Sequence, residues 1–157
     1  MDTFDLHTSQ MKMALWSHFS HSHSGVDFEI ELPGNAGRAD CIALDILNRE
    51  VTLVEIKRTR ADFRQGLSKF VDYKKTAHRC YVASPPQVIP YDEVPEDWGI
   101  IEFAEDFGEI IIVREANLAS CPAPFFDRYV KLILERARDH KYFLPAARKS
   151  YEKQIKK

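Results

Sequence analysis

The chain is poor in the features that mark several large classes of protein. Its 157 residues include only three cysteines, Cys41, Cys80 and Cys121, and no two of them form a Cys-x-x-Cys pair. Cysteines that are odd in number and widely spaced argue against a disulfide framework and against a zinc or iron–sulfur site built on cysteine. The sequence also has no low-complexity stretch and no internal repeat. These absences predict an ordinary folded domain from a reducing compartment.

Long apolar segments are missing as well. No apolar run approaches the roughly 20 residues that a membrane-spanning helix needs. The first residues, Met1 to Asp5, lack the basic and apolar regions of a secretory signal peptide. We therefore expect a cytoplasmic protein with no membrane partner.

Charge is balanced in total but uneven along the chain. The net charge is −2, yet residues 1–120 carry 12 Lys and Arg against 20 Asp and Glu, whereas residues 121–157 carry 10 against 4. An acidic body with a basic end predicts local contact with a polyanion. At this length one core is expected, so we assign residues 1–120 to a core and residues 121–157 to a C-terminal helix and basic tail packed on the same domain.

Hydrophobic periodicity predicts a mixed α/β (α+β) fold with a central mixed sheet flanked by helices. Thr8 or Ser9 is expected to cap a first helix that ends near Phe19, with Met11, Leu15 and Phe19 on one stripe. Thr59 is expected to cap a second helix, whose apolar positions Phe63, Leu67, Phe70 and Val71 follow helical spacing. Strands are predicted over residues 28–32, 41–46, 51–57 and 78–83, a hairpin over 98–103 and 109–113, and a last helix over 126–142.

The densest cluster of polar residues lies where two of these strands begin or end. Glu55-Ile56-Lys57 closes the apolar run that starts at Val51, and Asp40 opens the preceding strand. Because strand side chains alternate, Glu55 and Lys57 point to one face of the sheet and Ile56 to the other. Two acids that can hold a divalent cation, with a lysine beside them, are a plausible centre for metal-assisted phosphodiester hydrolysis.

The tripeptide has a simpler interpretation too. An acid-x-lysine pattern also occurs at Asp72-Tyr73-Lys74 and at Asp139-His140-Lys141. Both lie in predicted helices, where residues two apart do not face each other. Glu55 and Lys57 could still form a surface ion pair at a sheet edge, which contributes roughly 0–1 kcal/mol.

The order of elements and the position of these motifs resemble the PD-(D/E)XK nucleases. More narrowly, the stretch from Gly37 to about Phe103 is similar to the MmcB-like DNA repair family. The residues that carry this likeness are Gly37-Arg38-Ala39-Asp40, Val54-Glu55-Ile56-Lys57, Ala61-Asp62-Phe63, Lys69, Asp72-Tyr73, Arg79-Cys80-Tyr81-Val82-Ala83, Pro95 and Gly99-Ile100-Ile101. The resemblance implies a restriction-endonuclease-like core, here followed by a C-terminal hairpin and helix.

The resemblance also implies a catalytic site. Asp40, Glu55 and the main-chain carbonyl of Ile56 would bind Mg²⁺ or Mn²⁺, and Lys57 would orient the attacking water or stabilise charge on the phosphate. Hard oxygen ligands suit these cations. Many members place a further acid on the first helix, whereas Ser9 to Phe19 contains none. Glu29 or Glu31 could substitute, although a solvent-facing strand edge is the favoured interpretation of both.

Nucleic-acid contacts are expected just beyond the two acids. Positively charged and aromatic side chains near this point could track a phosphate backbone or stack on a base; they are Arg38, Arg58, Arg60, Arg64, Lys69 and Tyr73. The alternatives are a solvated helix face for the cations and a buried core position for the tyrosine.

These features favour a metal-dependent nuclease that acts on DNA in repair or maintenance. The first alternative is a non-catalytic module that keeps the fold and binds DNA or a protein partner. A second is an enzyme that acts on RNA. A homodimer is possible, since many folds of this type pair to cut two strands.

Overall fold

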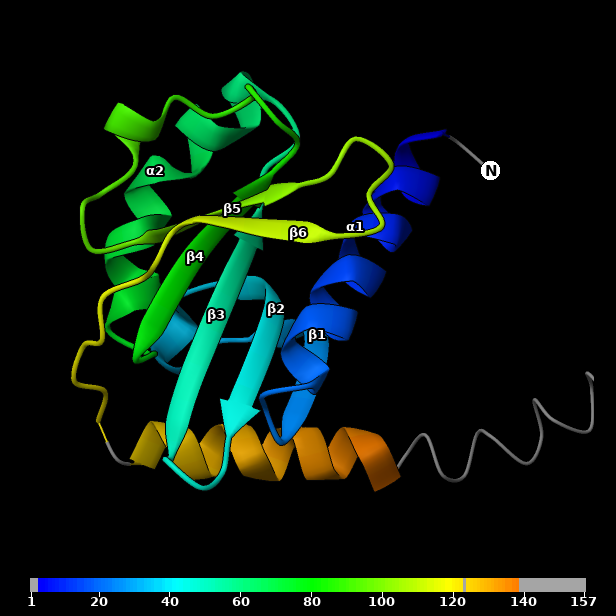
Figure 1. Ribbon diagram of the computed structural model, residues 1–157. Helices are drawn as coiled ribbons and strands as arrows, with labels where there is room; N and C mark the ends of the chain where they lie inside the picture. Colours follow the sequence, from blue (N-terminus) through cyan, green and yellow to red (C-terminus); the bar gives the residue numbers. More distant parts are fainter. Residues whose placement is uncertain (1–2, 123, 139–157) are drawn as a thin grey trace, which may run out of the picture. The chain divides into compact units, whose positions relative to one another are not determined.

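A computed structural model describes residues 3–122 and 124–138 of the chain (Figure 1). Two compact units divide the chain, residues 1–126 and residues 127–157. The first unit holds a six-stranded sheet with the order β1-β2-β3-β4-β5-β6. In the second, residues 127–138 are helical. The predicted basic tail and the end of the last predicted helix lie outside the described residues.

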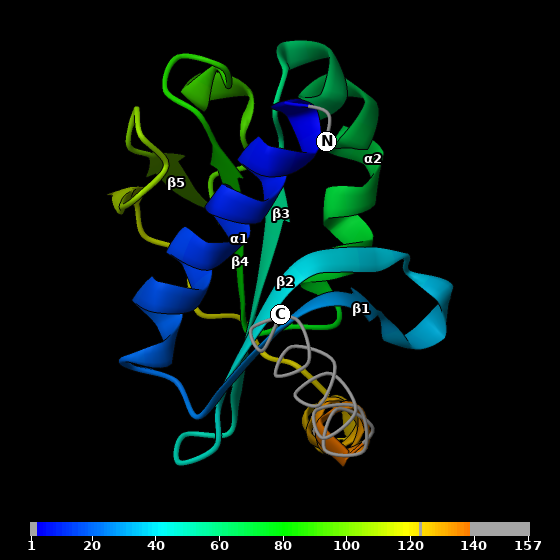
Figure 2. The same ribbon diagram turned by 90° about the vertical axis from the view of Figure 1, so that its right-hand side faces the viewer.

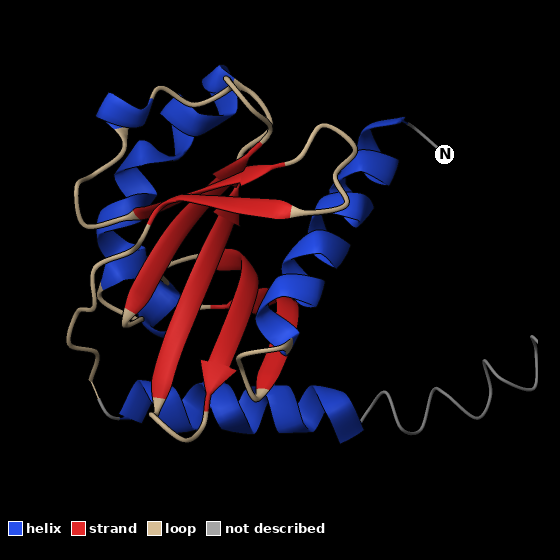
Figure 3. Cartoon of the chain, viewed as in Figure 1, coloured by secondary structure: helices blue, strands red, loops and turns tan. Residues whose placement is uncertain are grey.

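In the first unit, each of two α-helices is followed by three strands, in the order that the periodicity predicted (Figure 3). The two α-helices are α1 (Thr3–Ser20) and α2 (Arg60–Lys74). The strands are β1 (Gly25–Glu31), β2 (Arg38–Asp45), β3 (Glu50–Ile56), β4 (Arg79–Ser84), β5 (Gly99–Phe103) and β6 (Ile110–Arg114), and short 3₁₀ turns cover Pro33–Asn35 and Tyr91–Glu93.

The sheet is mixed, and the mixture follows from the connections. Short turns join β1, β2 and β3 as antiparallel neighbours, while α2 carries the chain from β3 to a parallel β4. A longer loop then places β5 parallel to β4, and a hairpin adds β6 antiparallel at the edge. A parallel pair needs such a crossover, because a tight turn can only reverse the strand. The predicted α/β fold with a mixed sheet is confirmed.

Each helix covers its own face of the sheet (Figure 2). The buried stripe of α1, Met11, Leu15 and Phe19, packs against Val54 and Ile56 of β3 and their neighbours on that face. Because side chains alternate along β3, Glu55 points to the other face, where α2 lies. There Phe70 of α2 stacks on Trp98 with ring centroids 4.2 Å apart. The end of β3 is therefore enclosed by one helix on each side.

Helix α2 begins where the sequence predicted. The Thr59 side chain accepts a hydrogen bond from the Asp62 backbone N–H at 3.1 Å, which satisfies one of the free donors of the first turn. Its buried face differs from the prediction at two positions, Tyr73 and Val71. Tyr73 is buried, whereas Val71, which was placed on the apolar stripe, is 65% exposed.

Helix α1 begins earlier than predicted. It starts at Thr3, so that Thr8 and Ser9 lie inside the helix and neither is its cap. No proline or glycine stands between Thr3 and Thr8 to stop the helix. The described part of the chain contains no helix with the length and apolar character of a membrane span.

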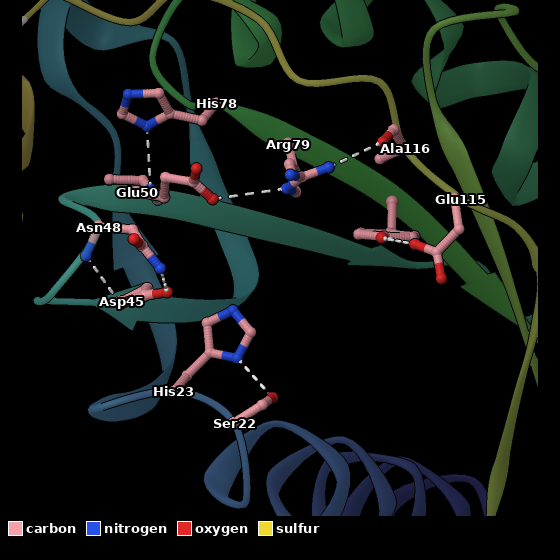
Figure 4. Close-up of polar contacts among 11 residues, drawn as sticks. Ser22, His23, Asp45, Asn48, Glu50, His78, Arg79, Glu115 and Ala116 are labelled. Carbon is pink, nitrogen blue, oxygen red and sulfur yellow. Dashed lines mark hydrogen bonds and ion pairs between the residues drawn. The ribbon is translucent and has the colours of Figure 1, made fainter.

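Polar contacts tie together the end of the sheet where β3 and β4 begin (Figure 4). Glu50 pairs with Arg79 at 3.6 Å, and the Arg79 guanidinium also donates to the Ala116 carbonyl at 3.2 Å. His78 accepts the Val51 backbone N–H through Nδ1 at 3.0 Å. Charged groups at this end of the sheet therefore have partners within the fold.

Candidate metal and nucleic-acid site

Three neighbouring strands bring acids together at the opposite end of the sheet. In the β2–β3 pairing Cys41 faces Val54, so that one step further Asp40 faces Glu55. In the β1–β2 pairing Glu29 lies between Phe28 and Ile30, which face Cys41 and Ala39, and this places Glu29 opposite Asp40. Directly opposed residues of antiparallel strands have Cβ atoms roughly 4.5–5.5 Å apart. The pairing alone thus brings the predicted acids Asp40 and Glu55 side by side.

Asp40 is tied to the backbone of the neighbouring strand. Its Oδ2 accepts the Ile56 N–H at 2.7 Å. This contact fixes the Asp40 carboxylate beside the last residue of β3, the residue whose carbonyl was predicted to join the metal site.

Glu55 is buried and only partly satisfied. The residue is 8% exposed, and its Oε1 lies 3.4 Å from the Lys57 Nζ. Its second oxygen, Oε2, is buried and makes no hydrogen bond of good geometry with the described residues, although the Tyr73 hydroxyl lies close enough to Glu55 for the carboxylate to add to the effect of burial in raising the pKa of the tyrosine. Glu29 Oε2 in the same pocket also lacks a hydrogen bond with the described residues. A buried polar atom without a partner costs roughly 1–3 kcal/mol.

Burial and mutual repulsion disfavour two negative charges here. Desolvation raises the pKa of Glu55 to about 7, the Asp40 charge adds to this, and the Lys57 ammonium opposes it. Desolvation likewise raises the pKa of Asp40, while its hydrogen bond from Ile56 lowers it. A cation placed between the two acids would offset both the desolvation and the mutual repulsion, and so lower both pKa values.

Lys57 is held under helix α2. Its ammonium contacts Glu55 and, at 3.8 Å, Asp62 in the first turn of the helix. A Cβ atom on Gly66 would lie only 2.6 Å from Nζ and 2.9 Å from Cε of Lys57. The absence of a side chain at Gly66 therefore leaves room for the Lys57 side chain. No pattern in the sequence indicated this role of Gly66.

A pocket of about 440 Å³ opens over these residues. It is polar, and its lining residues come from α1, β1, β2, the end of β3 with the segment that follows it, and α2. Its lining residues are Thr8, Lys12, Glu29, Arg38, Asp40, Glu55, Ile56, Lys57, Arg58, Asp62, Lys69 and Tyr73.

The structure brings most of the predicted site residues into this pocket. Of the predicted nucleic-acid contacts, Arg38, Arg58, Lys69 and Tyr73 line it. Arg60 and Arg64 do not: Arg60 is exposed at the start of α2, and Arg64 pairs with Glu93 at 3.3 Å.

Tyr73 lines the pocket with its hydroxyl end. The residue is 2% exposed, and its hydroxyl donates to the Arg38 carbonyl at 2.7 Å. The predicted stacking of this ring on a base does not agree with that burial. Tyr73 instead braces the start of β2, where Asp40 lies.

Sequence reasoning missed Thr8 and Lys12 of α1 as pocket residues and treated Glu29 only as a possible substitute ligand. Thr8 and Lys12 are four residues apart and therefore share one face of the helix. Glu29 forms ion pairs with Lys12 and with Arg38, both at 2.9 Å. The four-residue spacing of Thr8 and Lys12 was visible in the sequence, but the part of the sheet against which this face of the helix lies was not.

The donor set suits a hard divalent cation. Two carboxylates and a nearby main-chain carbonyl are oxygen ligands of the kind that Mg²⁺ and Mn²⁺ take, usually with several waters. The Glu55 Oε2, which makes no hydrogen bond with the described residues, is one such oxygen atom. Within residues 3–122 and 124–138, no group of three or more His, Cys, Asp or Glu side chains is placed to hold an ion.

A family model described as DNA repair protein MmcB-like matches residues 7–155. The chain belongs to the MmcB-like DNA repair family. This agrees with the resemblance found in its motifs, and membership suggests a role in DNA repair. No curated protein matches the chain.

A solved structure supports the fold of this MmcB-like protein. The chain is similar to the "SPO1766 protein of unknown function from Silicibacter pomeroyi", with a TM-score of 0.74 and 19% sequence identity. The match covers 88% of this chain and 90% of that one. At this identity the likeness concerns the fold.

Proposed function

We propose that this MmcB-like protein is a divalent-metal-dependent nuclease that hydrolyses DNA phosphodiester bonds during repair. The observation that carries the proposal is the buried Glu55 Oε2, which lacks a hydrogen-bond partner among the described residues and lies beside Asp40 in a polar pocket. Such an atom is available to bind an ion or a water molecule that enters the pocket. The same arrangement supports placing the chain in the PD-(D/E)XK superfamily.

Asp40, Glu55 and the Ile56 carbonyl would hold Mg²⁺ or Mn²⁺. When bound, such an ion lowers the pKa of its water and offsets charge on the phosphate. Asp40 is already oriented for this task by the Ile56 N–H, which holds one of its oxygens at 2.7 Å.

Lys57 would act next to the two acids. Its ammonium lies between Glu55 and Asp62, and its side chain fills the space next to Gly66, so few rotamers remain open to it. A fixed cation beside the reacting phosphate stabilises the negative charge that develops as water attacks. Lys57 would also orient that water by hydrogen bonding.

The cations around the pocket would bind the DNA backbone. Arg38, Arg58 and Lys69 line the pocket together with the two acids. Arginine and lysine contacts to phosphates position a nucleic acid without reading its sequence. A preference for DNA over RNA rests on family membership and can be tested with matched strands.

The test is cleavage by purified protein in Mn²⁺ or Mg²⁺, with supercoiled plasmid, single-stranded circular DNA and a matched RNA as substrates. Asp40→Asn and Glu55→Gln should abolish cleavage and keep the wild-type circular dichroism spectrum. Asp45→Asn, at the other end of β2, is the matched control and should cleave normally. Cleavage that survives in both site variants would refute the proposal.

A non-catalytic binding module is the second candidate. It is favoured because the pocket receives a lysine, Lys12, from α1, and because the described residues offer no group of three ligating side chains. Such a module binds DNA or a protein partner in EDTA and takes up no Mn²⁺ at Glu55. Calorimetric Mn²⁺ binding that is lost in Glu55→Gln would exclude it.

A further inference from the structure

Three charged side chains that line the pocket, Lys12 of α1, Glu29 of β1 and Arg38 of β2, form an ion-paired bridge. The Glu29 Oε1 accepts a hydrogen bond from the Lys12 ammonium at 2.9 Å. Its Oε2 lies 2.9 Å from the Arg38 Nε, an ion-pair distance, but makes no hydrogen bond with the described residues. The three side chains are accessible to different degrees: Lys12 is 27% exposed, Glu29 32% and Arg38 64%. Two cations from different elements thus converge on one anion in the lining of the pocket.

The backbone of Glu29 is unusual for a strand residue. Its φ is 55°, in the left-handed region, although it is neither glycine nor asparagine. Such a conformation costs roughly 1–2 kcal/mol for a residue with a Cβ atom, and strained residues of this kind cluster at functional sites.

The position of Glu29 adds a second unfavourable factor. Glu29 faces Asp40 across the β1–β2 pairing, and its charge raises the pKa of Asp40. Like charges directly opposite each other destabilise a sheet. Lys12 and Arg38 offset this repulsion by holding the Glu29 carboxylate.

A carboxylate between a lysine and an arginine occupies the place that a phosphate would take. Both anions offer oxygens to the same donors, and arginine pairs with either in similar geometry. We propose that Lys12 and Arg38 form a phosphate-binding site that Glu29 fills in the DNA-free protein and that a DNA backbone phosphate takes over on binding. The inference rests on the proposed DNA binding, and it does not require catalysis.

Displacement has a consequence for the metal site. Once a phosphate holds Lys12 and Arg38, the Glu29 charge beside Asp40 is no longer neutralised, and a divalent cation between the acids becomes more favourable. DNA and metal then strengthen each other's binding. Such a coupling is reciprocal by thermodynamic necessity.

The first experiment measures DNA affinity in EDTA, by fluorescence anisotropy of a short labelled duplex and of its single strand. Glu29→Gln should bind about two- to fivefold tighter than wild type because the internal competitor is weakened, a change typical of one partly exposed ion pair. Glu31→Gln makes the same charge change two residues along β1 and should stay close to wild type.

The cations provide the converse test in the same assay. Lys12→Gln and Arg38→Gln should weaken binding and reduce the salt dependence by about one phosphate contact each. Lys75→Gln, an exposed control at the end of α2 and outside the pocket, should do neither. Equal affinities for Glu29→Gln and Glu31→Gln, unchanged binding by Lys12→Gln, or no measurable DNA binding by any variant would overturn the proposal.

The second experiment separates this inference from the nuclease proposal. Calorimetry measures Mn²⁺ affinity with and without a phosphorothioate duplex that resists cleavage. Wild type should bind Mn²⁺ about two- to fivefold tighter with the duplex, and Glu29→Gln should lose this gain. If no variant binds Mn²⁺ while the EDTA results hold, the metal centre is wrong and the phosphate site is supported. If Mn²⁺ binds at Glu55 but the EDTA results fail, the metal centre is supported and the phosphate site is wrong.

Discussion

The two ends of strand β3 carry similar residues in different states. At its start, Glu50 pairs with Arg79, and Arg79 also donates to the Ala116 carbonyl (Figure 4). At its end, Glu55 lies beside Lys57, yet one of its oxygens is buried without a hydrogen-bond partner in the described part of the chain. At the first end the charged side chains have partners within the fold, whereas at the second end a carboxylate oxygen makes no hydrogen bond with the described residues.

Burial explains the difference between the two acids. The Glu50 side chain is 27% exposed and keeps contact with water, so its charge is inexpensive. Glu55 is nearly enclosed and faces a second acid, which raises its pKa to about 7. An acid and a base close together are therefore not enough to mark a functional site; an unsatisfied buried acid is the better sign.

Neutralising each glutamate in turn is the test with the largest expected effect on the difference between the two ends of β3. Glu55→Gln should lower cleavage at least about a hundredfold, the usual loss when a group that stabilises the transition state is removed. Glu50→Gln should leave cleavage near wild type and cost about 1 kcal/mol of stability or less. Equal losses of activity in the two variants would remove the distinction between the ends.

Stability as a function of pH tests the same difference without activity. The pKa of Glu55 is raised from 4.5 to about 7 in the folded protein, so the folded state holds this proton more tightly than the unfolded state. The free energy of unfolding should therefore fall as pH rises from about 4.5 to about 7, by up to roughly 3 kcal/mol.

Urea denaturation across this pH range, in EDTA, measures the effect. Glu55→Gln should lack this part of the decline, whereas Glu50→Gln should keep it. Parallel curves for wild type and Glu55→Gln would show that burial does not perturb this carboxyl.

Gly66 of α2 tests whether the position of Lys57 matters at the end of β3. Alanine at this position would place its methyl group within 2.6 Å of the Lys57 ammonium, which must then move. Cleavage should fall about tenfold, while stability stays level or rises, since alanine favours a helix over glycine by roughly 1 kcal/mol. Ser68→Ala, an exposed site on the same helix, is the control. A stable Gly66→Ala protein with full activity would mean that the position of Lys57 is unimportant.

The smallest effect is expected at the start of the strand. His78 Nδ1 accepts the Val51 N–H and must be unprotonated to do so, and burial lowers the pKa of His78. This contact stabilises the fold above about pH 6.5 and is lost as pH falls through the lowered pKa.

Thermal unfolding measures the contribution of His78. His78→Ala should cost about 1 kcal/mol at pH 8 and flatten the acid side of the stability curve. His21→Ala, in an exposed loop, should do neither.

Local patterns predicted much of the fold and eight of the twelve residues that line the pocket. The apolar run of β3, the Thr59 cap and the stripe of Met11, Leu15 and Phe19 each depend on neighbours within a few residues. Asp40 and Glu55 could be paired from sequence because a short turn joins their strands and fixes the register. The misplacement of Val71 shows the limit: Val71 directly follows the buried Phe70, about 100° further around the helix, and it faces solvent.

The remaining pocket residues depend on contacts between distant segments. Lys12 reaches Glu29 only because α1 packs beside β1, and Gly66 matters only because Lys57 lies beneath α2. The left-handed backbone of Glu29 has no counterpart in its side-chain type. Such features follow from the assembled fold and not from spacing along the chain.

The cap of α2 has a consequence for when the protein can act. Asp62 donates its N–H to the Thr59 cap of the helix, and its carboxylate lies 3.8 Å from the Lys57 ammonium, so the helix start and the lysine proposed to assist catalysis share one residue. A chain whose first helical turn has frayed also loses the support of Lys57. We therefore expect a newly made or heat-loosened chain to be harmless to DNA until this turn has closed.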